Sequence, residues 1–260
     1  MTPLFFGDAD KPLFGVHHQP TSSQFQDVSI VLCNPIGFEY GRAHIIMRSV
    51  ANQLAQIGYH VLRFDYYATG DSSGFNNQSS VSQWEEDLIT ACDEVKAISA
   101  TRKTSVIAYR FGALIACEVA KRYKFNKLIL WDPVINGQEY LHDLQLMHEK
   151  MLLDLFRFDP KYMSTSGDSA EMIGFDFHEG LRNEICELKL SSIDKIKTRK
   201  IEVFSYDDGY QVESIIDESN FLNKANMHLF EGTSEWMNPS KIESKVLPDS
   251  SITELVKVIG

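Results

Sequence analysis

The sequence has no long apolar run and an excess of acidic over basic residues. No stretch approaches the ~20 consecutive apolar residues that a membrane-spanning helix requires. Lysine and arginine total 25 against 36 aspartates and glutamates, which gives a formal net charge of −11 at pH 7. Because a nucleic-acid backbone is bound by clustered basic side chains, this balance argues against a nucleic-acid partner. We therefore expect neither membrane insertion nor nucleic-acid binding.

The sequence also lacks any cysteine or histidine pattern typical of a metal site. Its cysteines are Cys33, Cys92, Cys117 and Cys186. None forms a CxxC pair or a cysteine–histidine cluster with zinc-like spacing, so we expect reduced thiols in the interior. His17 and His18 have no carboxylate or third histidine at useful spacing, so neither a metal nor another cofactor is expected. The first residues do not resemble a signal peptide, and we predict a cytoplasmic protein.

What is present is an alternation of apolar runs and helical patterns. Strands are predicted at 28–33, 59–64, 105–108 and 127–131, and helices at 43–57, 81–98 and 112–123. This alternation is typical of a parallel sheet with crossover helices. The strand segments are continuously apolar, as parallel strands covered on both faces are. We predict an α/β fold in a single domain spanning residues 1–260, a length that supports one large core.

The alternation stops after residue 136 and resumes near residue 200. Residues 138–158 have a helical pattern, and 163–170 are polar and rich in serine and glycine. We interpret 138–197 as a cap or lid inserted over the carboxyl edge of the sheet. Beyond it the pattern predicts a strand at 200–206, a helix at 212–222, a strand at 226–230 and a last helix at 251–259.

One strand–turn–helix pattern lacks the residue that would make it catalytic. An apolar strand, a sharp turn and a small-residue helix follow one another at 105–116, which is the layout of a G-x-S-x-G nucleophile elbow. The five elbow positions are occupied by Ala108, Tyr109, Arg110, Phe111 and Gly112. A guanidinium stays protonated at physiological pH and is not a nucleophile. The central arginine therefore excludes attack on a carbonyl from this position.

Several segments resemble those of a known family. They are P-L-F-F-G (3–7), L-F-G (13–15), N-P-I-G-F-E-Y (34–40), R-F-D-Y-Y-A-T-G-D-S (63–72), Y-R-F-G-A (109–113) and W-D-P-V (131–134). Over nearly its whole length the chain resembles α/β-hydrolases of the serine-aminopeptidase-like branch, and more closely the bacterial hydrolase-like proteins associated with exosortase A systems and natural-product clusters. The resemblance implies an α/β-hydrolase fold: a mostly parallel central sheet with helices on both faces and a small helical cap. It also implies that arginine in place of the elbow serine is a family trait.

Two of the three members of a Ser-His-Asp triad are missing. The loop after the last predicted strand, 231–236, has no histidine to act as base, and His228 lies within that strand, where we expect it to pack in the sheet. The acid position after the 200–206 strand is filled by either Asp207 or Asp208. The oxyanion donors are retained: the backbone N–H of Phe111 and one from the turn around Gly37. A covalent acyl-enzyme at this elbow is not expected.

The remaining candidates leave two roles open for the arginine. Arg110 either binds a carboxylate or phosphate of a ligand, or forms an internal ion pair with Glu39 or Asp207. His44 joins Glu39 and Asp207 as a candidate for proton transfer. Asp132 follows a strand at the ligand-binding edge and either pairs with a basic group or contacts ligand. The predicted substrate-binding residues are Gly37, Phe38, Tyr109, Phe111, Asp132 and Trp236.

Two functional hypotheses follow. In the first, the protein binds an acyl ester, thioester or carboxylate small molecule and processes it without a covalent serine intermediate. Glu39, His44 and Asp207 would then transfer protons, while Arg110 recognises an anion. In the second, the protein is a catalytically inactive relative that binds a ligand or a partner such as a carrier protein or a synthase.

Overall fold

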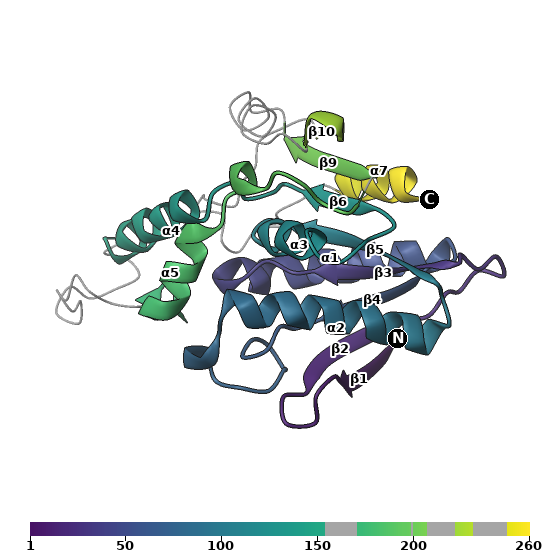
Figure 1. Ribbon diagram of the computed structural model, residues 1–260, viewed down its shortest axis with the longest axis horizontal. Coiled ribbons are helices and arrows are strands. Elements are labelled where there is room, and N and C mark those ends of the chain that lie inside the picture. The colour runs from purple at the N-terminus through teal and green to yellow at the C-terminus, as the bar shows by residue number, and fades with distance from the viewer. Residues whose placement is uncertain (154–170, 199, 207–221, 231–248) are drawn as a thin grey trace.

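A central eight-stranded sheet organises the computed structural model, which describes residues 1–153, 171–198, 200–206, 222–230 and 249–260 (Figure 1). Its strand order is β1-β2-β4-β3-β5-β6-β9-β10. The strands are β1 (Thr2–Phe6), β2 (Leu13–His18), β3 (Val28–Cys33), β4 (His60–Phe64), β5 (Lys103–Tyr109), β6 (Leu128–Trp131), β9 (Ile201–Tyr206) and β10 (Asn226–Phe230). The six strands from β4 to β10 in this order are parallel, whereas β1 and β2 form an antiparallel hairpin at one edge.

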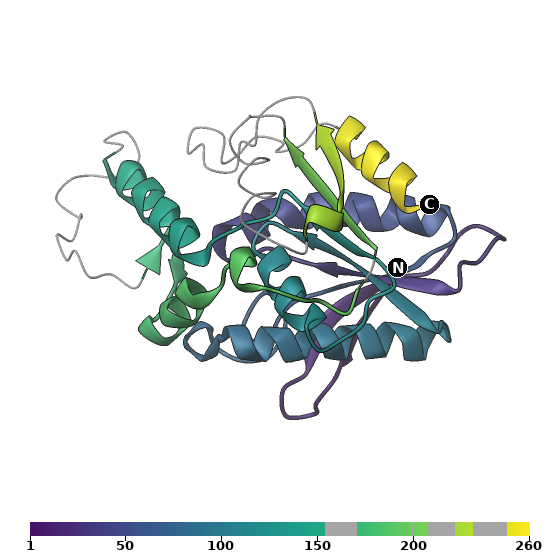
Figure 2. The same ribbon diagram turned by 45° about the horizontal axis from the view of Figure 1, so that its top comes forward.

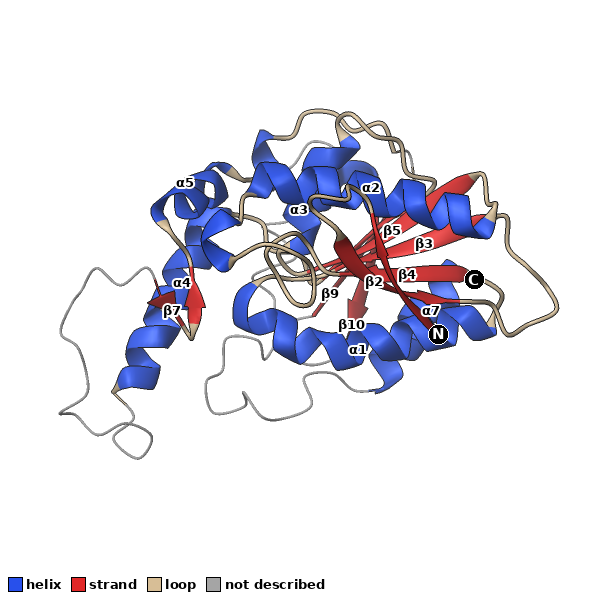
Figure 3. Cartoon of the chain, turned by 90° about the horizontal axis from the view of Figure 1, so that it is seen from below, coloured by secondary structure: helices blue, strands red, loops and turns tan. Residues whose placement is uncertain are grey.

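Helices cover both faces of this sheet (Figures 2 and 3). They are α1 (Gly37–Gln56), α2 (Val81–Ser99), α3 (Gly112–Ala120) and α7 (Asp249–Ile259). The apolar sides of α1 and α7 share one buried cluster with one face of the sheet, and those of α2 and α3 share a second cluster with the other face. The predicted α/β-hydrolase-like arrangement is therefore confirmed. The predicted helix at 212–222 lies almost entirely outside the described residues.

As far as it is described, the segment between β6 and β9 does not join the central sheet. Its described elements are α4 (Gly137–Leu152), a small hairpin of β7 (Glu171–Met172) and β8 (Phe175–Asp176), and α5 (Glu179–Glu187). We call this segment, residues 137–193 as far as they are described, the insert. It packs beside the start of α1, since a Cβ added at Gly37 would lie 3.0 Å from the Phe177 ring. That the insert moves as a lid stays a prediction.

A buried histidine connects β2 to α1 and β4. His18 is 1% exposed, its Nδ1 lies 3.0 Å from Asn52 Oδ1, and its Nε2 accepts a hydrogen bond from Arg63 Nε at 3.1 Å. A neutral ring with its proton on Nδ1 satisfies both partners, whereas a second proton would face Arg63. Burial and then the Arg63 charge accordingly lower the pKa of His18 to about 4.

This pKa predicts a specific loss of stability in acid. Between pH ~6.5, the ordinary histidine pKa, and pH ~4 the unfolded chain binds a proton at His18 that the folded chain does not, so stability falls as the pH falls. His18→Gln keeps one acceptor and one donor but does not titrate. We expect urea unfolding at a series of pH values to show the wild type losing about 2 to 3 kcal/mol relative to the variant across this range. Parallel curves for the two proteins would contradict the assignment.

Candidate functional site

The chain turns sharply between β5 and α3, and Arg110 occupies the corner. Its φ of 52° lies in the left-handed region, which a residue with a long side chain rarely adopts. The corner is fixed by hydrogen bonds from Arg110 N to Trp131 O and from Ala113 N to Arg110 O, both 3.0 Å. Gly112 completes it, because a Cβ there would lie 2.7 Å from the backbone oxygens of Cys33 and Asn34. This is the geometry in which an elbow presents its central side chain.

The Arg110 side chain is enclosed by carboxylates. Its Nε donates to Glu39 Oε1 at 3.0 Å, and its Nη1 lies 3.4 Å from Asp132 Oδ2 and 3.3 Å from the Asp132 carbonyl oxygen. The Arg110 side chain is 6% exposed, and both carboxylates are 0% exposed. Tyr140 donates to the second oxygen, Glu39 Oε2, at 3.4 Å. We call these four residues the Arg110 cluster; it contains the internal ion pair that was one of the two predicted roles.

Four separate elements converge to build this cluster. Arg110 follows β5, Asp132 follows β6, Glu39 lies in the first turn of α1 after β3, and Tyr140 belongs to α4 of the insert. Because β3, β5 and β6 are parallel neighbours, their carboxyl ends meet at the same edge of the sheet. Asp132 itself has a φ of 44°, and its N–H donates to Phe204 O at 2.7 Å. The fold therefore holds both carboxylates in place around the guanidinium.

Burial and charge act in opposite directions in the Arg110 cluster. Burial disfavours the charged guanidinium, but the carboxylates of Glu39 and Asp132 outweigh it and raise the pKa of Arg110 above its ordinary value. Burial raises the pKa of Glu39, and the neighbouring Arg110 opposes that rise. Arg110 therefore remains a cation at every physiological pH, and its charge is compensated within the protein.

Of the predicted proton-transfer residues, the structure describes Glu39 and His44 and does not bring them together. His44 is exposed, its Nδ1 lies 3.1 Å from Gly41 O, and it lines a cavity that Glu39 does not line. Asp207, Asp208 and Trp236 lie outside the described residues. His228 packs in the sheet as predicted: its ring stacks on Phe204, and its Nε2 lies 2.9 Å from Glu202 Oε2.

The aromatic residues flanking Arg110 are part of the core. Tyr109 is fully buried and stacks on Trp131 with ring centroids 4.5 Å apart. Phe111 is also fully buried, on the opposite face of the sheet from Tyr109, and its ring contacts that of Tyr140 on that same face. Phe38 is 8% exposed and belongs to the same core as Phe111. These side chains stabilise the elbow by packing, and a role in substrate binding at these positions, including the backbone N–H of Phe111, stays a prediction.

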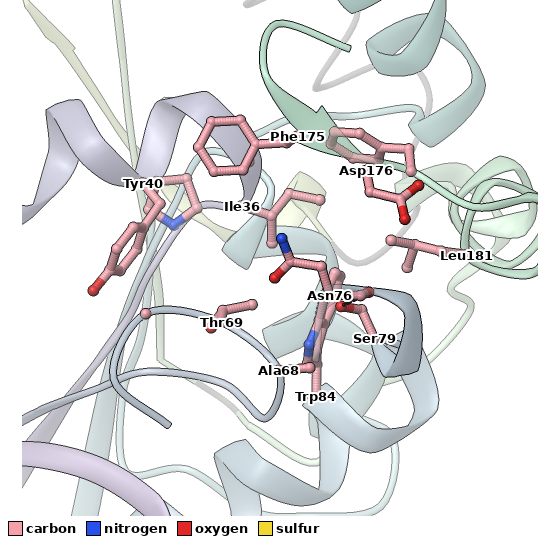
Figure 4. Close-up of a pocket in the computed structure, with 14 residues that line it drawn as sticks. Ile36, Tyr40, Ala68, Thr69, Asn76, Ser79, Trp84, Phe175, Asp176 and Leu181 are labelled. Atoms are coloured by element: carbon pink, nitrogen blue, oxygen red, sulfur yellow. Dashed lines mark hydrogen bonds between the residues drawn. The ribbon is translucent and has the colours of Figure 1, made fainter. Parts of the chain in front are cut away.

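A cavity of about 80 Å³ lies beside the elbow, between the turn that begins α1 and the insert (Figure 4). Ile36, Gly37 and Trp84 line it from the main domain, and Phe175 and Leu181 line it from the insert. In Figure 4, Phe175 and Asp176 lie opposite Trp84 across this space. We call it the Trp84 cavity. Arg110 does not line it, and Gly37 is the only predicted substrate-binding residue among its described lining residues.

Other kinds of site are not found in the described part of the chain. There, no group of three or more histidine, cysteine, aspartate or glutamate side chains is arranged to hold a metal ion. The cysteines are free thiols, three of them buried. Among the helices that the structure describes, none has the length and apolar character needed to cross a bilayer.

Comparisons with known proteins agree with this architecture. The structure is similar to an esterase from Pyrococcus furiosus (TM-score 0.68, 14% identity, 99% of this chain and 90% of that one). It is also similar to a proline iminopeptidase from Mycobacterium smegmatis (0.67, 10%, 99% and 97%) and to an alpha-beta serine hydrolase homologue from Coxiella burnetii (0.62, 15%, 99% and 95%). At these identities the similarity shows the fold alone.

The sequence itself gives the family. The comparison with curated proteins found no match. The family model described as "Serine aminopeptidase, S33" matches residues 30–167, which include β3 to β6, the elbow and α4. The chain therefore belongs to the serine aminopeptidase S33 family of α/β-hydrolase-fold proteins.

Proposed function

We propose that this protein binds a small uncharged ligand and forms no covalent serine intermediate with it. The observation that carries the proposal is the Arg110 cluster, in which a buried, charge-compensated cation stands at the nucleophile position of the fold. A cation whose carboxylate partners are 0% exposed is more simply explained as a structural element than as an anion receptor. Of the two functional hypotheses, this favours the catalytically inactive relative.

The contacts of Glu39 also argue against the enzymatic hypothesis. Its oxygens accept from Arg110 and Tyr140, and the side chain is 0% exposed, so no substrate or water molecule in this structure reaches it to give up a proton. His44, the other described candidate base, lies away from the cluster. The described residues thus offer no nucleophile and base in contact with each other at the elbow.

The Trp84 cavity indicates the class of ligand. Its walls are mostly apolar, and Tyr40, Thr69, Asn76 and Ser79 are the uncharged residues with hydrogen-bonding side chains other than Trp84 among the described lining residues. Asp176 is the only charged residue among the described residues that line it. A ligand carboxylate would be desolvated there without a compensating cation, which is costly. We therefore propose an uncharged acyl group, as part of an ester or thioester, and not a carboxylate. A carrier protein or synthase as partner, a biosynthetic pathway and a cytoplasmic location stay predictions.

Labelling with a fluorophosphonate tests this function. We expect intact-mass spectrometry to show no added mass after prolonged incubation, and p-nitrophenyl acetate and butyrate to be hydrolysed no faster than in buffer. A conventional serine esterase treated in parallel confirms that the reagents are active. A stoichiometric adduct on any serine, or turnover that survives repurification, would refute the proposal.

Ligand binding is measured separately. Saturation-transfer NMR with methyl butyrate should give a signal for the wild type that is lost in Leu181→Trp, where the larger ring fills the Trp84 cavity. A signal that is unchanged by this substitution would place the ligand elsewhere.

A further inference from the structure

A second and larger cavity lies on the other side of Tyr40. Its volume is about 200 Å³, and it is lined by residues of β2, of β4, of α1 and of the loops that follow β3 and β4. We call it the Arg63 cavity. It lies at the carboxyl end of β4, where parallel sheets commonly bind ligands. Tyr40 lines both cavities, but otherwise their described lining residues differ.

A cation faces the same space with part of its donor capacity unused. The Nε of Arg63 is engaged by His18, but none of the described residues forms a hydrogen bond with its two Nη groups. A guanidinium presents these groups as a planar fork that matches the two oxygens of a carboxylate. Arg63 can therefore bind a carboxylate without giving up its contact with His18.

Two carboxylates line the cavity as well. Asp65 is 7% exposed and is held by Tyr40 Oη at 2.7 Å and by the Asp71 N–H at 3.0 Å. Asp71 is exposed, and its own carboxylate accepts no hydrogen bond from the described residues. With Arg63, these give the wall one positive and two negative side chains. A purely anionic ligand would meet the two carboxylates, and a purely cationic one would meet Arg63.

We infer that the Arg63 cavity binds a small zwitterion of the α-amino acid class. The ligand carboxylate accepts from the Nη groups of Arg63. The ammonium donates to the exposed carboxylate of Asp71. This assignment uses the guanidinium fork and the exposed carboxylate together, and it does not depend on the Trp84 cavity or on the elbow.

The test compares three probes on the intact protein. We expect L-alanine to bind in a ligand-observed NMR titration up to about 10 mM, a range suited to weak sites. Glycine betaine has the same charges but no N–H donor, and it should bind at least about tenfold more weakly because it cannot donate a charge-assisted hydrogen bond to Asp71. Sorbitol, an uncharged polyol, should not bind.

Matched variants locate the site. Asp71→Asn removes an exposed charge and should weaken L-alanine binding about five- to tenfold, whereas Asp10→Asn, an exposed carboxylate outside the cavity, should leave it unchanged. Arg63→Met removes the guanidinium fork and should abolish binding; the Asp71 variant keeps the test valid if Arg63→Met does not fold.

Four outcomes would overturn the inference: no L-alanine binding by folded protein, equal binding of betaine, binding of sorbitol alone, or equal effects of the Asp71 and Asp10 substitutions. None of them depends on whether a fluorophosphonate reacts, so this inference and the proposed function can fail independently.

Discussion

Replacing Arg110 with methionine is expected to lower the free energy of unfolding by about 3 to 5 kcal/mol. Methionine nearly matches the length of the arginine stem but carries no charge. Glu39 and Asp132 would then remain 0% exposed without their cation. Breaking a buried ion pair in this way costs more than the pair contributes in the wild type, because the remaining charges are left without compensation. Urea unfolding followed by circular dichroism measures the loss.

The matched control is an arginine in an exposed ion pair. Arg102 pairs with Asp27, and its side chain is 82% exposed. Arg102→Met should leave the unfolding curve unchanged, because exposed ion pairs contribute little to stability. If Arg110→Met were as stable as the wild type, the Arg110 cluster would not hold the elbow together, and a ligand-binding role for the guanidinium would become the better explanation.

The second large effect is expected at Gly137, the first residue of α4. A Cβ at this position would overlap the backbone carbonyl oxygen of Ile185 on α5, and backbone cannot move aside as a side chain can. Gly137→Ala should therefore force α4 and α5 apart and lower the free energy of unfolding by about 2 to 3 kcal/mol. Because α5 supplies Leu181 to the Trp84 cavity, methyl butyrate binding should weaken as well.

Gly41→Ala makes the same chemical change where there is space. Gly41 lies within α1, with nothing within 4 Å of an added Cβ. Alanine there should stabilise the helix by about 0.5 to 1 kcal/mol. If the Gly137 and Gly41 variants had equal stabilities, the result would contradict the close approach of α4 and α5 seen in the structure.

The sheet could be predicted wherever burial determines the sequence pattern. The predicted bounds of β3 match the structure, and those of β4 and β6 differ by one residue, because each run is apolar and closed by polar or turn-forming residues. The predicted bounds of β10 also match, although only Phe230 of this strand is buried. The hairpin of β1 and β2 was not predicted. As an edge strand β1 is mostly exposed, so its sequence carries no buried face to recognise. The β7–β8 hairpin is too short to leave a pattern.

The site could be predicted in part. The elbow pattern located Arg110, and strand ends converging at one edge brought Glu39 and Asp132 to it. The predicted position of His44 failed because α1 begins at Gly37 and not near residue 43. Five residues at ~100° per residue turn His44 about 140° away from Glu39 on the helix. The Arg63 cavity was not predicted, although Arg63, Asp65 and Asp71 all lie in the R-F-D-Y-Y-A-T-G-D-S segment, since its walls come from segments that only the folded chain brings together.

A double-mutant cycle between Arg110 and Glu39 tests the central claim most directly. The single variants Arg110→Met and Glu39→Gln and the double variant are unfolded in urea under identical conditions. We predict that the double variant is more stable than the sum of the single effects implies, with a coupling free energy of about 2 kcal/mol or more, since removing both charges leaves less uncompensated charge buried. Additive effects, with a coupling close to zero, would show that the arginine at the elbow is not held by this carboxylate and would contradict the account.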